Sequence, residues 1–128
     1  MPLVLWCLVV LLLIPYVLAA LGGYYKLRHL GGLDLHHPRA QDAGLTGIGN
    51  RIRASQSNAW EALTFFIGCL LVASLRGAPL ETLALPALLF TATRLAHPLL
   101  YVGDLPPLRS AMVLVGLISG LYLAVWAG

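Results

Sequence analysis

Residues 3–21, LVLWCLVVLLLIPYVLAAL, form an apolar run of nineteen residues without a single charged side chain. At a rise of about 1.5 Å per residue, a helix of this length approaches the roughly 30 Å thickness of the hydrocarbon core of a bilayer. The run therefore predicts a membrane-spanning helix. Pro15 lies inside it, and because neighbouring helices can satisfy the backbone groups that a proline leaves free, we expect a kink there rather than a break.

A cleavable signal peptide is the alternative interpretation of this first run. Such peptides begin with a positively charged segment and have an apolar stretch of about 7–15 residues. Residues 1–2 carry no basic side chain, and the apolar run is longer. We therefore expect it to remain in the protein as a helix. No segment of organelle-targeting type precedes it, so we expect the protein to lie in a bacterial inner membrane.

The composition of the whole chain agrees with its first run. Of the 128 residues, 59% are hydrophobic and only 10% are charged, whereas about a quarter of the residues in a soluble domain are charged. This composition excludes a soluble globular domain and predicts a single-domain integral membrane protein over residues 1–128. Cys7 and Cys69 both lie in apolar runs without the spacing of a metal site, so we expect small buried residues there.

Three further apolar runs predict helices of spanning length, so the expected fold class is an all-α, integral membrane four-helix bundle. These helices are expected from a start between residues 45 and 51 to Leu75, from about 79 to 101, and from about 108 to 126. The turn GDLPP at residues 103–107 separates the last two, and its prolines suit the first turn of a helix. Residues 22–50 hold two Gly-Gly pairs and are predicted to be a loop.

The basic residues are concentrated on one side of the predicted bundle. The loop after the first helix and the start of the second helix carry Lys26, Arg28, Arg39, Arg51 and Arg53, whereas the loop before the third helix carries only Arg76. Basic loops stay in the cytoplasm. This distribution predicts that the first loop is cytoplasmic and that both termini lie outside. The formal net charge of +3 is explained by this placement, and we expect no nucleic-acid partner.

Polar residues occur at helical spacing inside two of the apolar runs. Arg94, His97 and Tyr101 are three and seven residues apart and share one stripe, and Asn58 and Glu61 are three residues apart. An ionised side chain at membrane depth costs at least about 2.5–3.5 kcal/mol, so it seeks a partner or a wet cavity. We expect Arg94 and Glu61 to pair. The structural alternative is that this pair only fixes the register of two helices.

Arginines outnumber acidic residues at the predicted cytoplasmic end, where Arg51, Arg53, Arg94 and Arg109 face only Glu61 and Asp104. A planar guanidinium binds carboxylates in a bidentate manner, so this excess favours a ligand that carries carboxylates. Arg109 and Ser110 open the fourth helix, where free N–H groups and the helix dipole attract anions. A thiol bound there would ionise more readily to the nucleophilic thiolate.

The first loop contains two weaker candidates. Adjacent histidines such as His36 and His37 rarely converge on one ion, and no acidic residue or cysteine completes a ligand set, so we expect a solvated loop and no metal. Asp34 and Asp42 could transfer protons if the loop folds over the site. The alternative is that both aspartates are capping residues or are simply exposed to solvent.

Together these residues resemble the MAPEG family, the membrane-associated proteins in eicosanoid and glutathione metabolism. The stretch RIRASQSNAWEALTFF (51–66) is similar to the family pattern R-x-x-A-x-x-x-N-x-x-E. The stretch RLAHPLLYVGDLPPLRS (94–110) resembles R-x-x-H-x-x-x-Y followed by a short turn and Arg-Ser. The resemblance covers nearly the whole chain, and it implies a homotrimer of four-helix bundles with glutathione bound between subunits near the cytoplasmic face.

The resemblance also implies roles for individual residues. The glutathione-binding residues would be Arg51, Asn58, Glu61, Arg94, His97 and Tyr101, with Glu61 on the amine and the arginines on the carboxylates. Arg109 and Ser110 would stabilise the thiolate, and Arg28 is a further candidate ligand. Gln56 stands where many members have histidine, and Ala54 and Ser57 stand where several have arginine. These departures predict weaker binding of the glutathione carboxylates.

Two functions remain open from the sequence. The first is a glutathione-dependent transferase or peroxidase whose thiolate attacks a small lipophilic electrophile or hydroperoxide arriving from the bilayer. The second is a non-catalytic trimeric membrane protein whose polar end binds a lipid headgroup or only fixes helix packing.

Overall fold

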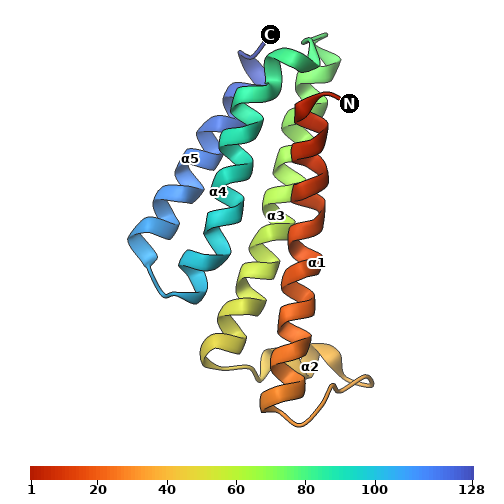
Figure 1. Ribbon diagram of the computed structural model, residues 1–128, viewed down its shortest axis with the longest axis vertical. Coiled ribbons are helices and arrows are strands. Elements are labelled where there is room, and N and C mark those ends of the chain that lie inside the picture. Colours follow the sequence, from red (N-terminus) through yellow and green to blue (C-terminus); the bar gives the residue numbers. More distant parts are fainter.

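The computed structural model describes residues 1–128 as four long helices and two short ones (Figure 1). The long helices are α1 (Leu3–His29), α3 (Gly47–Leu75), α4 (Ala84–Val102) and α5 (Pro106–Val125). The short ones are α2 (Pro38–Ala43) and the 3-10 helix η1 (Leu80–Leu83), which leads into α4. Each long helix, with η1 counted as part of α4, is long and apolar enough to cross a membrane. The predicted all-α membrane bundle is therefore confirmed.

The helices are arranged as two closely packed pairs. α1 lies along α3, and α4 lies along α5 (Figure 1). Helix α3 also contacts α4 and α5, and α1 contacts α4, so α3 and α4 form the centre of the bundle. Both chain termini lie at one end, and α2 lies at the other, which we call the α2 end (Figure 1).

The apolar core is built from residues of all four long helices, with Phe66 and Phe90 at its centre. Their ring centroids lie 5.0 Å apart. Cys7 and Cys69 are both buried in this core and form no disulfide, as the sequence predicts. Most of the remaining large apolar side chains point outward, which suits a protein whose surroundings are lipid rather than water.

Small residues let α5 approach its neighbours closely. Gly116 and Gly120 lie four residues apart on its inner face. A Cβ atom added at Gly120 would lie 2.4 Å from Cε1 of Phe65, and one at Gly116 would lie 3.0 Å from Oγ1 of Thr93. Helices in a membrane gain stability chiefly from such close packing, because lipid tails are as apolar as the side chains.

The first helix is longer than the sequence predicts. It ends at His29 rather than near Leu21, so the N-terminal part of the predicted loop is helical. The hydropathy change after Leu21 marks the end of the apolar run, not the end of the helix. Tyr25 packs against Gly49 of α3, where an added Cβ would lie 2.5 Å from its ring, and this contact supports the extension. The helix passes Pro15 without a break.

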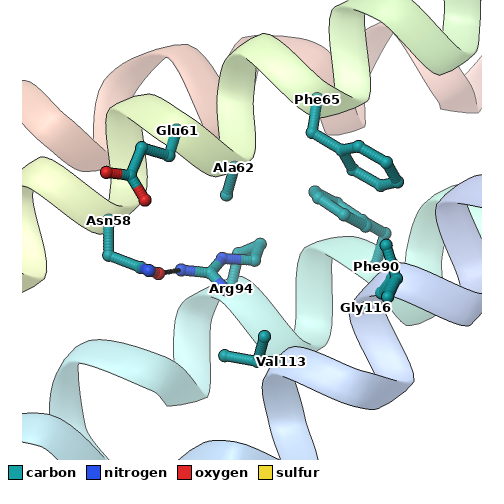
Figure 2. Close-up of a pocket in the computed structure, with 9 residues that line it drawn as sticks. Asn58, Glu61, Ala62, Phe65, Phe90, Arg94, Val113 and Gly116 are labelled. Carbon is teal, nitrogen blue, oxygen red and sulfur yellow. Dashed lines mark hydrogen bonds between the residues drawn. The ribbon is translucent and has the colours of Figure 1, made fainter.

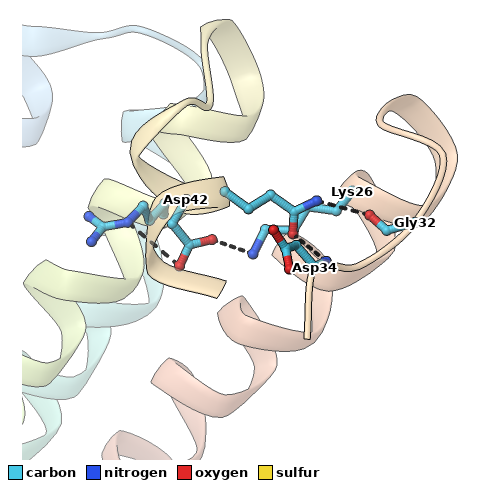
Figure 3. Close-up of polar contacts among 6 residues, drawn as sticks. Lys26, Gly32, Asp34 and Asp42 are labelled. Atoms are coloured by element: carbon cyan, nitrogen blue, oxygen red, sulfur yellow. Dashed lines mark hydrogen bonds and ion pairs between the residues drawn. The ribbon is translucent and has the colours of Figure 1, made fainter. Parts of the chain in front are cut away.

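The remainder of the predicted loop also contains the short helix α2, which polar contacts tie to its neighbours (Figure 3). Lys26 of α1 forms an ion pair with Asp42 of α2, whose other oxygen lies 3.8 Å from Nε of Arg53. Asp34 accepts hydrogen bonds from the backbone N–H groups of His36 and His37, at 3.1 and 2.9 Å. Both aspartates thus have structural partners, Asp34 within the loop and Asp42 on the flanking helices α1 and α3.

Candidate functional site

A recess of about 180 Å³ lies between α3, α4 and α5 (Figure 2). The helices contribute polar residues at one side of it and apolar residues at the other. The lining residues are Asn58, Glu61, Ala62 and Phe65 of α3, Phe90 and Arg94 of α4, and Val113, Gly116 and Leu117 of α5. The recess therefore combines a membrane-embedded polar patch with an apolar wall.

Arg94 is the most deeply buried charged side chain of the molecule, with only 5% of its surface exposed. Its Nη2 donates a hydrogen bond to Oδ1 of Asn58, as Figure 2 shows, and its Nε has no partner. The predicted ion pair between Arg94 and Glu61 is not formed. The two ion pairs within 4.0 Å both involve Asp42. The guanidinium instead donates its hydrogen bond to the side-chain amide of Asn58, and Glu61 is exposed.

The recess thus holds one guanidinium and one carboxylate that form no direct ion pair. A buried charge without a direct ion pair is costly at membrane depth, where water cannot solvate it. Figure 2 shows Glu61 and Arg94 on opposite walls, on α3 and α4. Such an arrangement can accept a ligand that carries both a carboxylate and an ammonium group.

His97 and Tyr101, the other two residues of the R-x-x-H-x-x-x-Y stretch on α4, lie nearer the α2 end than Arg94 does. The ring centroids of His97 and Tyr101 lie 5.7 Å apart, and the guanidinium of Arg109 lies 4.4 Å above the Tyr101 ring. A tight turn makes this contact possible, because Asp104 adopts a positive φ of 56° and Leu105 donates its N–H to the carbonyl of Leu100. Arg109 precedes Val113 of the recess by one helical turn.

None of the remaining candidates lines the recess. Arg51 lies two turns before Asn58 on α3, is partly buried, and has an unpartnered Nε. Ser110 is exposed at the start of α5, next to Arg109. Arg28 is exposed near the end of α1, with its guanidinium 5.8 Å from the centre of the Tyr24 ring. A single chain therefore does not bring Arg51, Arg94 and Arg109 into one cavity.

Helix α3 exposes a polar stripe on the face that the other helices leave free. Arg53, Ser57, Glu61 and Thr64 follow one another at helical spacing and are all exposed. Ser57 and the partly buried Gln56 line a small polar hollow together with Arg53. A polar stripe on a spanning helix does not face lipid. This face of α3 therefore requires another polar surface or water.

Ser55 is a buried polar residue that the sequence did not single out. It is 0% exposed, and its hydroxyl has no hydrogen-bond partner. Its position could have been noticed, because it lies four residues after Arg51 and three before Asn58, on the same stripe of α3.

The chain matches one protein family over almost its whole length. A model described as the MAPEG family matches residues 3–128, which include all four spanning helices and every residue of the recess. No curated protein and no solved structure gives a significant match to the chain.

Proposed function

Because the chain belongs to the MAPEG family, a family of glutathione-related membrane enzymes, we propose that it binds glutathione and activates the thiol as a thiolate. The thiolate then attacks a small lipophilic electrophile or hydroperoxide that enters from the bilayer. The observation that carries this proposal is the recess in which Arg94 and Glu61 form no direct ion pair. Glutathione has carboxylates for the arginine and an ammonium group for the glutamate.

The thiolate would be held at the start of α5 by Arg109 and Ser110. The guanidinium and the free N–H groups of the first turn both favour negative charge. The proton of the thiol leaves to solvent. With an electrophile, the sulfur forms a bond to carbon and the leaving group departs with the electron pair. With a hydroperoxide, the sulfur attacks the distal oxygen, the O–O bond breaks, and the alkoxide leaves and is protonated to the alcohol. The glutathione sulfenic acid formed in this step reacts with a second glutathione to give the disulfide and water.

A lipophilic second substrate would approach Arg94 from the bilayer along an apolar groove. A groove of about 320 Å³ lies between α1 and α4, lined by Val10, Leu13, Ile14, Val17, Leu18, Leu95 and Pro98. Arg94 borders both this groove and the polar recess. The groove therefore leads from the membrane to the residue that we propose holds the glutathione carboxylate.

The proposed assembly is a homotrimer in a bacterial inner membrane, with both termini outside the cytoplasm. Two observations support an oligomer. Pockets for small ligands usually measure about 300–1,000 Å³, so a recess of about 180 Å³ needs a further wall to enclose a tripeptide. The exposed polar stripe of α3 also requires a polar partner. A neighbouring copy would supply both, and it would bring the remaining candidate ligands, Arg28 among them, toward the site.

Replacing Arg109 by alanine tests the chemistry. We expect the purified protein to show thiolate absorbance on adding glutathione and to conjugate 1-chloro-2,4-dinitrobenzene. Loss of one donor to a developing anion typically costs about 10²–10³ in rate, so Arg109→Ala should reduce conjugation by about that factor. The matched control is Arg39→Ala, an exposed arginine on α2 outside the recess, which should conjugate at the unaltered rate. Equal rates for the two variants would contradict the proposal.

The alternative function, in which the polar end binds a lipid headgroup or only fixes packing, is favoured by the hydrogen bond that Arg94 already makes inside the chain. A thermal-shift titration separates the two. A ligand that binds only the native protein stabilises it by mass action, about 2.7 kcal/mol at one hundred times its Kd. If glutathione leaves the unfolding midpoint unchanged at saturating concentration, the packing role stands.

A further inference from the structure

Two fully buried polar atoms lie on the facing helices α3 and α4. Ser55 on α3 is 0% exposed and His97 on α4 is 1% exposed. Neither Oγ of Ser55 nor Nδ1 of His97 has a hydrogen-bond partner. Buried polar atoms in folded proteins nearly always have one, from the protein or from an ordered water.

The register of the two helices places these residues at the same level. α3 and α4 run in opposite directions and contact each other (Figure 1). The hydrogen bond between Arg94 and Asn58 fixes which turns face one another. One turn nearer the α2 end, Ser55 lies three residues before Asn58 on α3. His97 lies three residues after Arg94 on α4, at the same level.

The hydroxyl of Ser55 is available for a contact between helices. Serine and threonine side chains in a helix often bond a carbonyl of the preceding turn, as Ser119 does to Val115 at 2.8 Å and Thr64 to Trp60 at 3.0 Å. Ser55 makes no such bond. A hydroxyl can donate one hydrogen bond, and the unprotonated nitrogen of a neutral imidazole can accept one.

We propose that Ser55 donates a hydrogen bond to Nδ1 of His97 through one shared water, and thereby fixes the ring as the tautomer that carries its proton on Nε2. Ser55 is then a positioning residue for His97. The inference concerns the free protein and does not depend on glutathione binding. It implies that His97 offers its ligands a hydrogen-bond donor at Nε2, which suits an anionic or carbonyl-bearing group.

A competing arrangement predicts the opposite tautomer. Pro98 has no N–H, so the carbonyl of Arg94 lacks the donor that usually bonds it in a helix. A proton on Nδ1 of His97 could be donated to that carbonyl. In this arrangement Ser55 would not affect the ring. Whether Nδ1 of His97 carries a proton therefore decides between the two arrangements.

Nitrogen NMR of protein labelled with 15N-histidine provides the test, in lipid nanodiscs and without glutathione. His97 is assigned by comparison with His97→Gln. We expect its Nδ1 to be unprotonated and its Nε2 protonated in the unaltered protein. In Ser55→Ala, the ratio of the Nδ1–H to the Nε2–H form should rise about fivefold, as expected for the loss of a hydrogen bond of about 1 kcal/mol.

Two comparisons keep the test specific. Ser119→Ala removes another buried serine hydroxyl, on α5, and should leave the His97 signals unchanged. Ser55→Thr keeps a hydroxyl and should retain the ratio of the unaltered protein. Protonated Nδ1 in the unaltered protein would overturn the inference even if Ser55→Ala failed to fold, and so would an unchanged ratio in a folded Ser55→Ala. Absence of glutathione binding would leave it intact.

Discussion

At the scale of single residues, Arg94 connects most of the features of the site. It is buried, it bonds Asn58 rather than Glu61, and it borders both the polar recess and the apolar groove. A charge in this position is tolerated only because a polar side chain meets it. The stability of the unliganded protein should therefore depend on Asn58 more than on Glu61.

Asn58→Ala tests this dependence. The substitution leaves the guanidinium of Arg94 buried without its partner, and hydrogen bonds to charged groups contribute about 1.5–3 kcal/mol. We expect the free energy of unfolding to fall by about that amount, measured by denaturant unfolding in detergent micelles. Asn50→Ala, which alters an exposed asparagine near the start of the same helix, should change it by less than about 0.5 kcal/mol. Equal losses would show that the bond to Arg94 does not stabilise the fold.

At the scale of elements, the packing of α5 depends on its glycines. Gly120 lies against the ring of Phe65 and near Sγ of Cys69, both on α3, so α3 and α5 approach closely there. At the end of the bundle that holds the termini, Arg76 ties α3 to α5 by donating hydrogen bonds to the carbonyls of Ala124 and Ala127, at 2.9 and 2.6 Å. The position of α5 in turn decides where Arg109 and Val113 lie.

Gly120→Ala should disturb this packing. The added methyl would lie 2.4 Å from the Phe65 ring, which must move, and overpacking of this kind typically costs about 1–3 kcal/mol. The measurement is the unfolding midpoint in micelles. Gly68→Ala is the matched control, because a Cβ there meets nothing within 4 Å and removing a glycine from a helix stabilises it by about 0.5–1 kcal/mol. Opposite signs for the two variants are expected, and a stabilised Gly120→Ala would contradict the close approach.

At the scale of the whole molecule, a single chain leaves the polar stripe of α3 uncovered and the recess without its last wall. Both features concern the same face, because Glu61 belongs to the stripe and also lines the recess. One neighbouring copy placed against α3 would cover the stripe and complete the site. Oligomerisation and ligand binding should therefore depend on one another.

Cysteine crosslinking tests the proposed contact between copies. Thr64→Cys places a thiol on the exposed stripe of α3, whereas both native cysteines are buried. We expect oxidation in the membrane to give disulfide-linked dimers, and a mass of three chains of 13.7 kDa for the unoxidised protein in micelles. Leu99→Cys, exposed on α4 on the side that faces α1, should crosslink much less. Monomers throughout, without crosslinks, would rule out the trimer.

Hydropathy and spacing predicted much of this molecule. The apolar runs predicted all four spanning helices, and the start of α3, its end at Leu75, and α5 follow the predicted ranges within a few residues. Helical spacing also placed Asn58 with Glu61 on one stripe and Arg94 with His97 on another. These predictions succeed because burial in lipid requires long apolar helices, and because the helical repeat is fixed by the backbone.

The sequence by itself therefore determined the class of fold, the family and the stripes on which the polar residues lie. Only the tertiary structure decided that Arg94 bonds Asn58, that α1 continues to His29 against Gly49, and that Ser55 is buried at the level of His97. The physical reason is that periodicity fixes directions around one helix axis. The partner of a side chain depends instead on the relative height and rotation of two helices, which the packing of the whole bundle sets.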